Sequence, residues 1–381
     1  MIHLLNANAL HIPLAAGTVQ CVITSPPYWG LRDYGTAEWV GGSGDCDHVD
    51  PQGPVNAPSD KSTLTTNNGQ GPKAGDKYHS DKTAQYKHQC PKCGAIRKDA
   101  QLGLEATPDE FLANMVSVFR EVWRVLKDNG VLWLNMGDSY ATTPPGNRGK
   151  HAQGEIGDGN YARKWDRQLG HGEDKKAIYK KTSLPPKNLI GMPWRLAFAL
   201  QSDGWILRSD IIWHKPNPMP ESVTDRPTKA HEYVFLLSKQ GRYFYDADAV
   251  RENHVRLWNP LAKNGSFTGG GIPRAEKADG RIPNPKGRNR RTVWTVATQP
   301  YSGSHFATFP TALIEPMILA GSRPGDLVLD PFSGTATVGE VSRKHHRRYV
   351  GLELNPEYIE LAKERTRHIQ PTLFDFNSVM A

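Results

Sequence analysis

Cysteine is scarce in this chain of 381 residues, and long apolar runs are missing. Four cysteines do not make a disulfide scaffold at this length. No apolar run approaches a membrane span, and the N-terminus, Met1 to Leu4, lacks the basic segment of a signal peptide. We therefore expect a cytoplasmic protein that has no membrane partner.

Two nucleotide-binding signatures are absent as well. The chain contains neither the Gly-Lys-Ser/Thr end of a P-loop nor a Gly-x-Gly-x-x-Gly turn. A nucleotide-dependent oxidoreductase would need such a phosphate-binding turn, so that class of enzyme is disfavoured.

The composition that is present fits a large α/β protein with insertions. Hydrophobic residues make up 38% of the chain and supply a core, whereas 36 glycines and 29 prolines imply long irregular stretches. The net charge of +8 fits a polyanionic partner such as nucleic acid.

A proline-rich turn is the first candidate site. The apolar run Val19–Ile23 predicts a buried parallel strand, and Thr24-Ser25-Pro26-Pro27-Tyr28-Trp29 follows it. The prolines fix φ and remove two N–H donors. The Ser25 hydroxyl and the Pro26 carbonyl therefore remain as rigid acceptors, beside the ring of Tyr28.

Such acceptors suit a planar amine conjugated to a ring. Acceptors that take its N–H bonds stabilise the positive charge that develops when the amine attacks an electrophile. Tyr28 is placed to stack on a base turned out of its helix. The alternative reading is a proline-stiffened turn with a packed tyrosine.

The second candidate site lies near the C-terminus. Asp326–Asp330 predicts a strand that runs into the glycine turn Pro331–Gly339, after which a helix opens. A close approach at Gly334 without a phosphate cradle indicates a nucleoside that lacks phosphates. The next strand, Arg348–Leu354, ends in Glu353, about 20 residues past Gly334, where an acid can hold ribose hydroxyls.

The long polar loop between Gly30 and Ile96 carries a candidate metal site. Cys46 and His48 stand at its front, and the knuckle Cys90-Pro91-Lys92-Cys93 at its back. This spacing predicts a structural zinc site, with His88 as the rival of His48. A redox pair and unbound thiols are the alternatives.

The remaining ordered elements follow from periodicity and capping. Thr107, Pro108 and Glu110 start a helix that we expect to end at Asn129-Gly130. We also expect a strand over Val131–Asn135, a helix around Pro193–Ser202, and strands over Trp205–Trp213 and His231–Leu237.

Polar and basic groups at strand ends and in loops are candidate DNA contacts. The irregular stretch from about Asp246 to Tyr301 carries basic residues near Trp258 and Trp294, a pattern that suits phosphate contact and base stacking. A solvated basic loop is the alternative. The predicted set is Trp29, His214, Lys215, Asn217, Arg281, Lys286, Arg288, Arg290 and Arg291.

Together the two turns resemble those of the S-adenosylmethionine-dependent DNA amino-methyltransferases. Asp-Pro-Phe-Ser-Gly-Thr is similar to their cofactor loop and Thr-Ser-Pro-Pro-Tyr-Trp to their catalytic loop, in the order of the permuted β class. The resemblance implies a Rossmann-like α/β fold, with a mostly parallel twisted sheet and helices on both faces. The implied cofactor residues are Asn8, Thr24, Phe309, Asp330, Pro331, Phe332, Ser333, Gly334, Thr335, Glu353, Leu354 and Asn355.

The resemblance further implies direct methyl transfer to a flipped base in a specific double-stranded DNA sequence. Ser25, Pro26, Pro27 and Tyr28 are the implied catalytic residues. Ser-Pro-Pro-Tyr is associated mainly with the N4 amine of cytosine, and N6 of adenine is the alternative. Asn8 stands where the family often has an acid.

The insertions divide the methyltransferase domain, and other functions stay open. A zinc-containing DNA-binding regulator is the non-enzymatic alternative, and a related Asn-Pro-Pro-Tyr group modifies protein glutamine. The resemblance leaves open a homodimer and a cognate restriction endonuclease as partners. The predicted boundaries are methyltransferase segments 1–35, 101–140, 188–245 and 305–381, the zinc insertion 36–100, the basic insertion 141–187 and the recognition region 246–304.

Overall fold

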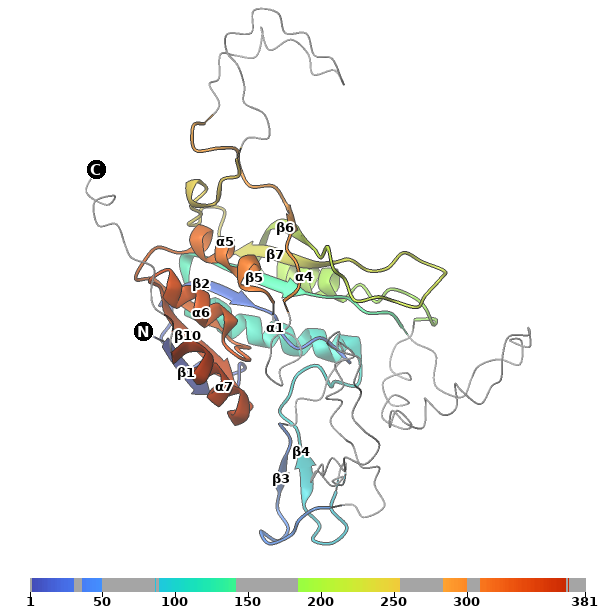
Figure 1. The fold of residues 1–381 in the computed structure, drawn as a ribbon. Coiled ribbons are helices and arrows are strands. Elements are labelled where there is room, and N and C mark those ends of the chain that lie inside the picture. Colours follow the sequence, from blue (N-terminus) through green and yellow to red (C-terminus); the bar gives the residue numbers. More distant parts are fainter. Residues whose placement is uncertain are drawn as a thin grey trace, which may run out of the picture.

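The computed structural model describes residues 2–30, 36–49, 86, 89–141, 184–253, 284–299, 309–367 and 369. Their centre is one sheet of eight strands in the order β1-β10-β9-β2-β5-β7-β6-β8 (Figure 1). Among the described residues, no helix has both the length and the apolar character needed to cross a membrane. The strand bounds are β1 Ile2–Asn6, β2 Val19–Thr24, β5 Leu126–Met136, β6 Ile206–His214, β7 His231–Ser238, β8 Val293–Thr295, β9 Leu327–Asp330 and β10 Arg348–Glu353.

The sheet is mostly parallel, as predicted. Only β7 runs against its neighbours β5 and β6 in the pairings of this sheet. All six residues of β2 are buried because the strand lies in the middle of the sheet with helices on both faces. A strand covered on both sides reads as a continuous apolar run rather than as an alternating one.

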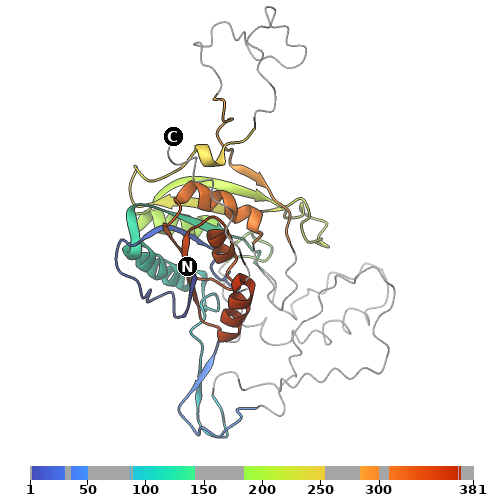
Figure 2. The same cartoon turned by 60° about the vertical axis from the view of Figure 1, so that its left-hand side comes forward.

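Helices cover both faces of the sheet (Figures 1 and 2). On one face α1 (Pro108–Val125) and α4 (Met192–Ser202) pack into one buried cluster. On the other face α5 (Thr311–Gly321), α6 (Thr337–Lys344) and α7 (Pro356–Arg367) pack into a second cluster. The described part of the chain therefore has the predicted Rossmann-like arrangement.

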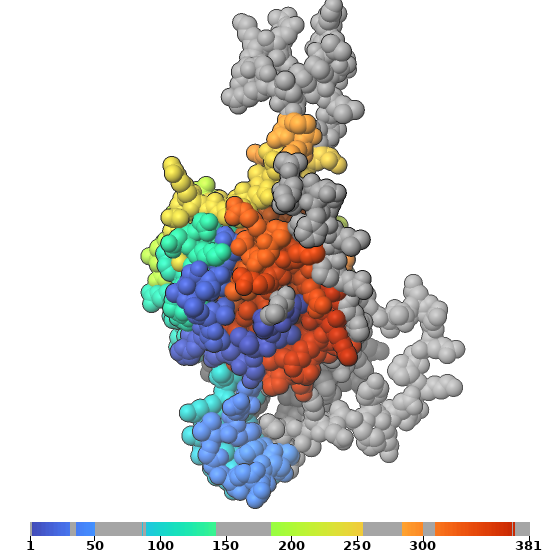
Figure 3. Space-filling model, turned by 90° about the vertical axis from the view of Figure 1, so that its left-hand side faces the viewer, coloured from blue at the N-terminus to red at the C-terminus, as the bar shows by residue number. Residues whose placement is uncertain are grey.

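A small lobe projects from this body. The strands β3 (Glu38–Val40) and β4 (Ile96–Lys98) pair antiparallel and form a separate sheet of two strands. Figure 3 shows the lobe standing out beyond the helices and the main sheet. We call the described residues 36–49, 86 and 89–103 the β3–β4 lobe.

The start of α1 is confirmed, but its predicted end is wrong. Thr107 Oγ1 accepts a hydrogen bond from the Glu110 N–H at 3.2 Å, as a helix cap does. The helix ends at Val125, and Asn129-Gly130 lies within β5. Gly130 is needed there for packing: a Cβ at this position would stand 2.6 Å from the Leu126 side chain.

Two other local expectations are corrected. The helix after the Gly334 turn begins at Thr337 and so contains Gly339, whose Cα packs on the ring of Tyr349. The stretch predicted to be irregular contains β8 and the short 3-10 helix η1 (Asp248–Val250). Sequence patterns missed β8 because it has only three residues, and its pairing with β6 holds it in place.

Candidate active site

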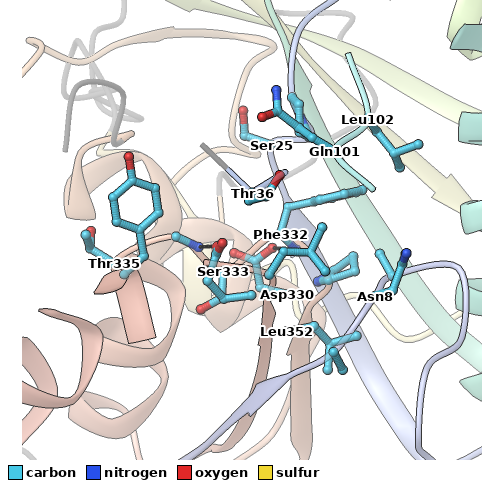
Figure 4. Close-up of a pocket in the computed structure, with 18 of the residues that line it drawn as sticks. Asn8, Ser25, Thr36, Gln101, Leu102, Asp330, Phe332, Ser333, Thr335 and Leu352 are labelled. Atoms are coloured by element: carbon cyan, nitrogen blue, oxygen red, sulfur yellow. Dashed lines mark hydrogen bonds between the residues drawn. The ribbon is translucent and has the colours of Figure 1, made fainter. Parts of the chain in front are cut away.

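The Ser25 turn and the Gly334 turn open onto one pocket (Figure 4). They follow β2 and β9, which are neighbours in the sheet, and Glu353 ends the adjacent strand β10. The carboxyl ends of parallel neighbours meet at the same edge, where open α/β sheets bind ligands. Of the predicted residues, Asn8, Ser25, Pro27, Phe309, Asp330, Pro331, Phe332, Ser333, Gly334, Thr335, Glu353 and Leu354 line this pocket.

Asp330 is the buried acid at the floor of the pocket. Its side chain is 1% exposed, and its Oδ1 accepts from the Thr24 hydroxyl at 2.7 Å and from the Phe332 N–H at 3.0 Å. Burial raises the pKa of Asp330 to about 7, and the bond from Thr24 opposes this rise. Asp330 therefore joins the two motif strands.

Glu353 is anchored to the Gly334 turn. Its Oε2 accepts from the Gly334 N–H, and its Oε1 from the Asn355 N–H, each at 2.9 Å. Burial raises its pKa. Each carboxylate oxygen can accept more than one hydrogen bond, so the group is fixed by these two bonds and still has acceptor capacity for two vicinal hydroxyls of a ligand.

The turn itself brings backbone close to the ligand space. Gly334 and Ala336 both have positive φ, at 50° and 58°. The Ser333 hydroxyl forms a buried 2.8 Å hydrogen bond with Tyr349 and is therefore engaged within the protein. A tight left-handed turn with a glycine lets the backbone approach a ligand closely.

A second polar network holds the Ser-Pro-Pro-Tyr turn. The Tyr28 hydroxyl donates to Glu232 Oε2 at 2.9 Å and lies 3.4 Å from the Ser25 hydroxyl. Burial, with the nearby charge of Glu232, raises the pKa of Tyr28 well above its ordinary value. The ring has room because Gly137 leaves no Cβ against it. The Tyr28 hydroxyl is therefore neutral and is held by hydrogen bonds within the protein.

Sequence reasoning missed the partners of Tyr28. Glu232 on β7 is also paired with Lys215 and accepts from the Asn135 side-chain amide at 3.3 Å. Lys215 lies over the Trp213 ring, 4.3 Å from its centroid. The sequence offered one signal for these partners: Glu232 and Asn135 are polar residues within two predicted apolar strands. It did not show that the two residues meet, because the pairing between β5 and β7 is not visible in the sequence.

Some predicted residues lie beside the pocket rather than in it. Thr24, Pro26, Tyr28 and Asn355 do not line it, although Thr24 and Asn355 contact acids that do. Asn8 does line the pocket, and its side-chain oxygen also closes a local turn by accepting a hydrogen bond from the Leu10 N–H. The pocket wall missed by sequence reasoning comprises Ala7, Ala9, Thr36, Gln101, Leu102, Thr337, Leu352 and Tyr358.

The structure argues against two aromatic residues as DNA contacts. Trp29 and Trp294 are each 5% exposed and pack in the two core clusters. Their indole N–H groups donate to the backbone carbonyls of Glu105 and Arg291. We therefore drop Trp29 from the predicted DNA-contacting set and no longer expect Trp294 to stack on bases; Trp258 lies outside the described residues.

The basic residues of the recognition region have acidic neighbours. Arg288 and Arg291 both pair with Glu252, and Lys286 pairs with Asp248. Arg290 lies over the Trp294 ring, and Arg281 is outside the described residues. At the end of β6, His214 contacts Thr295, and the Asn217 side chain exchanges hydrogen bonds with the backbone of Thr298. Phosphate contact by these residues stays a prediction.

The four predicted metal ligands converge in the β3–β4 lobe. The ligand atoms of Cys46, His48, Cys90 and Cys93 all lie within 4.8 Å of one another. His88 lies outside the described residues. Cys21 is fully buried in the core, away from this cluster, as expected of a small packed side chain.

Similarity to known proteins identifies the family. A family model described as DNA methylase matches residues 19–364. The chain belongs to this family. The methylase is 42% identical over 354 residues to the Type II methyltransferase M.Cfr9I of Citrobacter freundii, which covers 92% of this chain and 82% of the relative. It is 39% identical over 348 residues to M.SmaI of Serratia marcescens, covering 91% and 83% of the two chains.

Solved structures bear out the fold of the methylase. The PvuII DNA methyltransferase (cytosine-N4-specific) aligns over 98% of this chain and 88% of its own, with a TM-score of 0.51 and 15% identity. At that identity the match shows the fold alone. The resemblance to S-adenosylmethionine-dependent DNA amino-methyltransferases, drawn from the two motifs, is thereby confirmed by the family match.

Proposed function

We propose that this DNA amino-methyltransferase methylates the exocyclic N4 amine of cytosine in a specific double-stranded DNA sequence. The observation that carries the proposal is that Ser25 and Gly334 line the same pocket. S-adenosylmethionine, when bound, supplies an electrophilic methyl group. The Glu353 carboxylate holds the ribose hydroxyls, and the Gly334 turn lets the ligand approach the backbone.

The Ser25 turn binds and polarises the target amine. The Pro26 carbonyl and the Ser25 hydroxyl accept its N–H bonds and favour a pyramidal, nucleophilic nitrogen. The bound cofactor would supply the methyl group as a sulfonium electrophile, and the amine held by Ser25 and Pro26 would accept it and release one proton to water. Tyr28, held by Glu232, stacks on the flipped base.

Serine at position 25 favours cytosine over adenine. In the family that the two motifs resemble, Ser-Pro-Pro-Tyr is associated mainly with the N4 amine of cytosine. The similarity to Type II methyltransferases supports a role in restriction-modification, beside a cognate endonuclease. A homodimer and a cytoplasmic location stay predictions.

One experiment tests substrate and product together. The protein is incubated with mixed-sequence DNA and methyl-labelled S-adenosylmethionine, and the DNA is digested to nucleosides and separated. We expect the label in N4-methylcytosine. Label in N6-methyladenine would show that the target base is adenine and not cytosine. Unlabelled DNA would contradict the proposed function. The matched control is the double variant Ser25→Ala, Tyr28→Ala, which should bind the cofactor but transfer no methyl group.

A further inference from the structure

We propose that Cys46, His48, Cys90 and Cys93 bind one zinc ion, which holds the β3–β4 lobe rigid beside the active-site pocket. Cys46 Sγ lies 3.7 Å from Cys90 Sγ, and Cys93 Sγ lies 3.6 Å from His48 Nδ1. Zinc–sulfur bonds of about 2.3 Å in a tetrahedron place two sulfurs roughly 3.8 Å apart, and a sulfur and a nitrogen about 3.6 Å apart. These two pairs already have that spacing, and all four ligand atoms lie within 4.8 Å of one another.

The backbone of the lobe is shaped around the sulfur atoms. Gly42 passes so close that a Cβ there would stand 2.7 Å from Cys93 Sγ. The Ala95 and Ser43 N–H groups donate to the Cys93 sulfur, and the His48 N–H donates to the Cys46 sulfur. Such N–H bonds to sulfur orient and stabilise thiolates that bind a metal.

The donor set points to a closed zinc site. Three thiolates and one imidazole in a tetrahedron are typical ligands of structural zinc. Four protein ligands leave no position for water or substrate, so the ion has a structural role. A disulfide between Cys46 and Cys90 would give Cys93 and His48 no reason to converge on the same point, whereas a metal explains all four side chains.

The lobe needs such a link because it has almost no core of its own. Its strands have three residues each, and Val40 and Ile96 are 46% and 52% exposed. Small units with so little buried apolar surface are usually stabilised by disulfides or metals. The Trp39 ring stacks on His48 with centroids 4.4 Å apart, which joins β3 directly to the ligand cluster.

The end of the β3–β4 strand pair that is opposite the ligand cluster reaches the active-site pocket. Thr36 precedes β3, Gln101 and Leu102 follow β4, and all three line the pocket (Figure 4). The Thr36 hydroxyl donates to Asp99 Oδ1 at 2.8 Å and ties the two chains together at this end. The ion therefore fixes one end of the β3–β4 strand pair, and the residues at the opposite end form one wall of the pocket.

Metal content gives the first test and requires no activity. The full chain, purified without chelating resin and dialysed against a weak chelator, is analysed by mass spectrometry for metals. We expect one zinc per chain, and loss of it in Cys46→Ala and in Cys93→Ala. Asp47→Asn is the matched control: Asp47 lies between two ligands and pairs with Lys92, but it is not one of the four.

Cobalt substitution and hydrogen exchange test the geometry and the role. Cobalt-loaded protein should show the ligand-field and thiolate charge-transfer bands of a tetrahedral site, and zinc removal should speed amide exchange in β3 and β4 but not in β2 or β9. Cofactor binding by calorimetry shows that each variant is still folded.

Three results would overturn the zinc site. They are a folded wild-type chain without zinc, cysteine variants that keep their zinc, and a Cys46–Cys90 disulfide found by mass mapping of the unreduced protein. None of these results bears on methyl transfer, so they are distinguishable from a failure of the proposed function.

Discussion

Thr24 Oγ1 donates a 2.7 Å hydrogen bond to Asp330 Oδ1, and both groups are buried. The two residues are the last of β2 and β9, strands that are adjacent in the sheet but far apart in the sequence. This bond fixes the Ser25 turn against the Gly334 turn. The distance between the two halves of the site therefore depends on a contact inside the sheet and not on either loop.

The first prediction concerns the pH dependence of stability at Asp330. Its pKa is raised to about 7 in the fold, whereas an unfolded aspartate titrates near 4. The native state therefore holds the extra proton between these values, and the contribution of Asp330 to stability falls as the pH rises through about 7. Asp330→Asn keeps an acceptor for Thr24 but cannot ionise. We expect the stability difference, wild type minus variant, to fall by an amount on the order of a few kcal/mol between about pH 5 and about pH 8.

Urea unfolding of both proteins at the two pH values measures this effect. Because the other titrating groups are shared, the difference between the proteins isolates Asp330. A wild type and a variant whose stabilities run parallel with pH would contradict the raised pKa.

The second prediction concerns Glu353, which we propose holds the ribose hydroxyls. Glu353→Gln keeps the size of the side chain but removes its charge, which weakens hydrogen bonds from ligand hydroxyls and from the Gly334 N–H. Loss of a charged hydrogen bond costs about 1.5–3 kcal/mol, so we expect the Kd for S-adenosylmethionine to rise roughly 10- to 100-fold. Titration calorimetry measures it. Glu357→Gln, an exposed acid in the first turn of α7, is the control and should leave the Kd unchanged.

The third prediction separates the ring of Tyr28 from its hydroxyl. Tyr28→Ala removes the surface on which we propose that a flipped base stacks, and such stacking is worth about 1–3 kcal/mol per base. We expect kcat/KM for methyl transfer to fall roughly 10- to 100-fold with unchanged cofactor affinity. Tyr28→Phe keeps the ring and loses only the hydrogen bonds of the hydroxyl, to Glu232, Ser25 and Asn135, so its activity should fall less. Equal losses in both variants would reject stacking and assign the role to the hydroxyl.

The fourth prediction concerns DNA affinity and salt. Lys286 is 66% exposed and pairs with the half-exposed Asp248; Lys363 on α7 is 57% exposed and pairs with Glu360. If Lys286 contacts a phosphate, Lys286→Ala lowers the slope of log affinity against log salt by about 0.9. Lys363→Ala is the matched control and should not change the slope. Fluorescence anisotropy with a labelled duplex, over a series of salt concentrations, makes the measurement. A slope for Lys286→Ala equal to that of the wild type would remove this residue from the interface.

Local chemistry made much of the site predictable. The two turns are continuous stretches in which proline, serine and glycine dictate the backbone shape, so Ser25 and Gly334 are predictable from the sequence. Glu353 is predictable from its position at the end of the next strand. The ends of elements were harder to predict. Asn129-Gly130 has the composition of a helix stop, but in the fold the glycine makes room for Leu126 within a strand.

Long-range partners were beyond the reach of sequence patterns. Glu232 meets Tyr28 only because β7 pairs with β5, and Trp294 is buried only because the three residues of β8 add to β6. The Arg288 and Arg291 side chains read as free positive charge along the chain, yet Glu252 lies against both.

The amino-acid sequence by itself determined the residue types of the two motif turns and the spacing of the cysteines and the histidine proposed to bind a metal. Backbone preference and side-chain type are local properties, so a short segment of sequence is enough to determine them. Only the tertiary structure decided that the two turns share a pocket, that Cys46 and His48 meet Cys90 and Cys93, and which charged groups are paired. Those facts depend on which strands lie side by side, and strand order is set by the packing of the whole core.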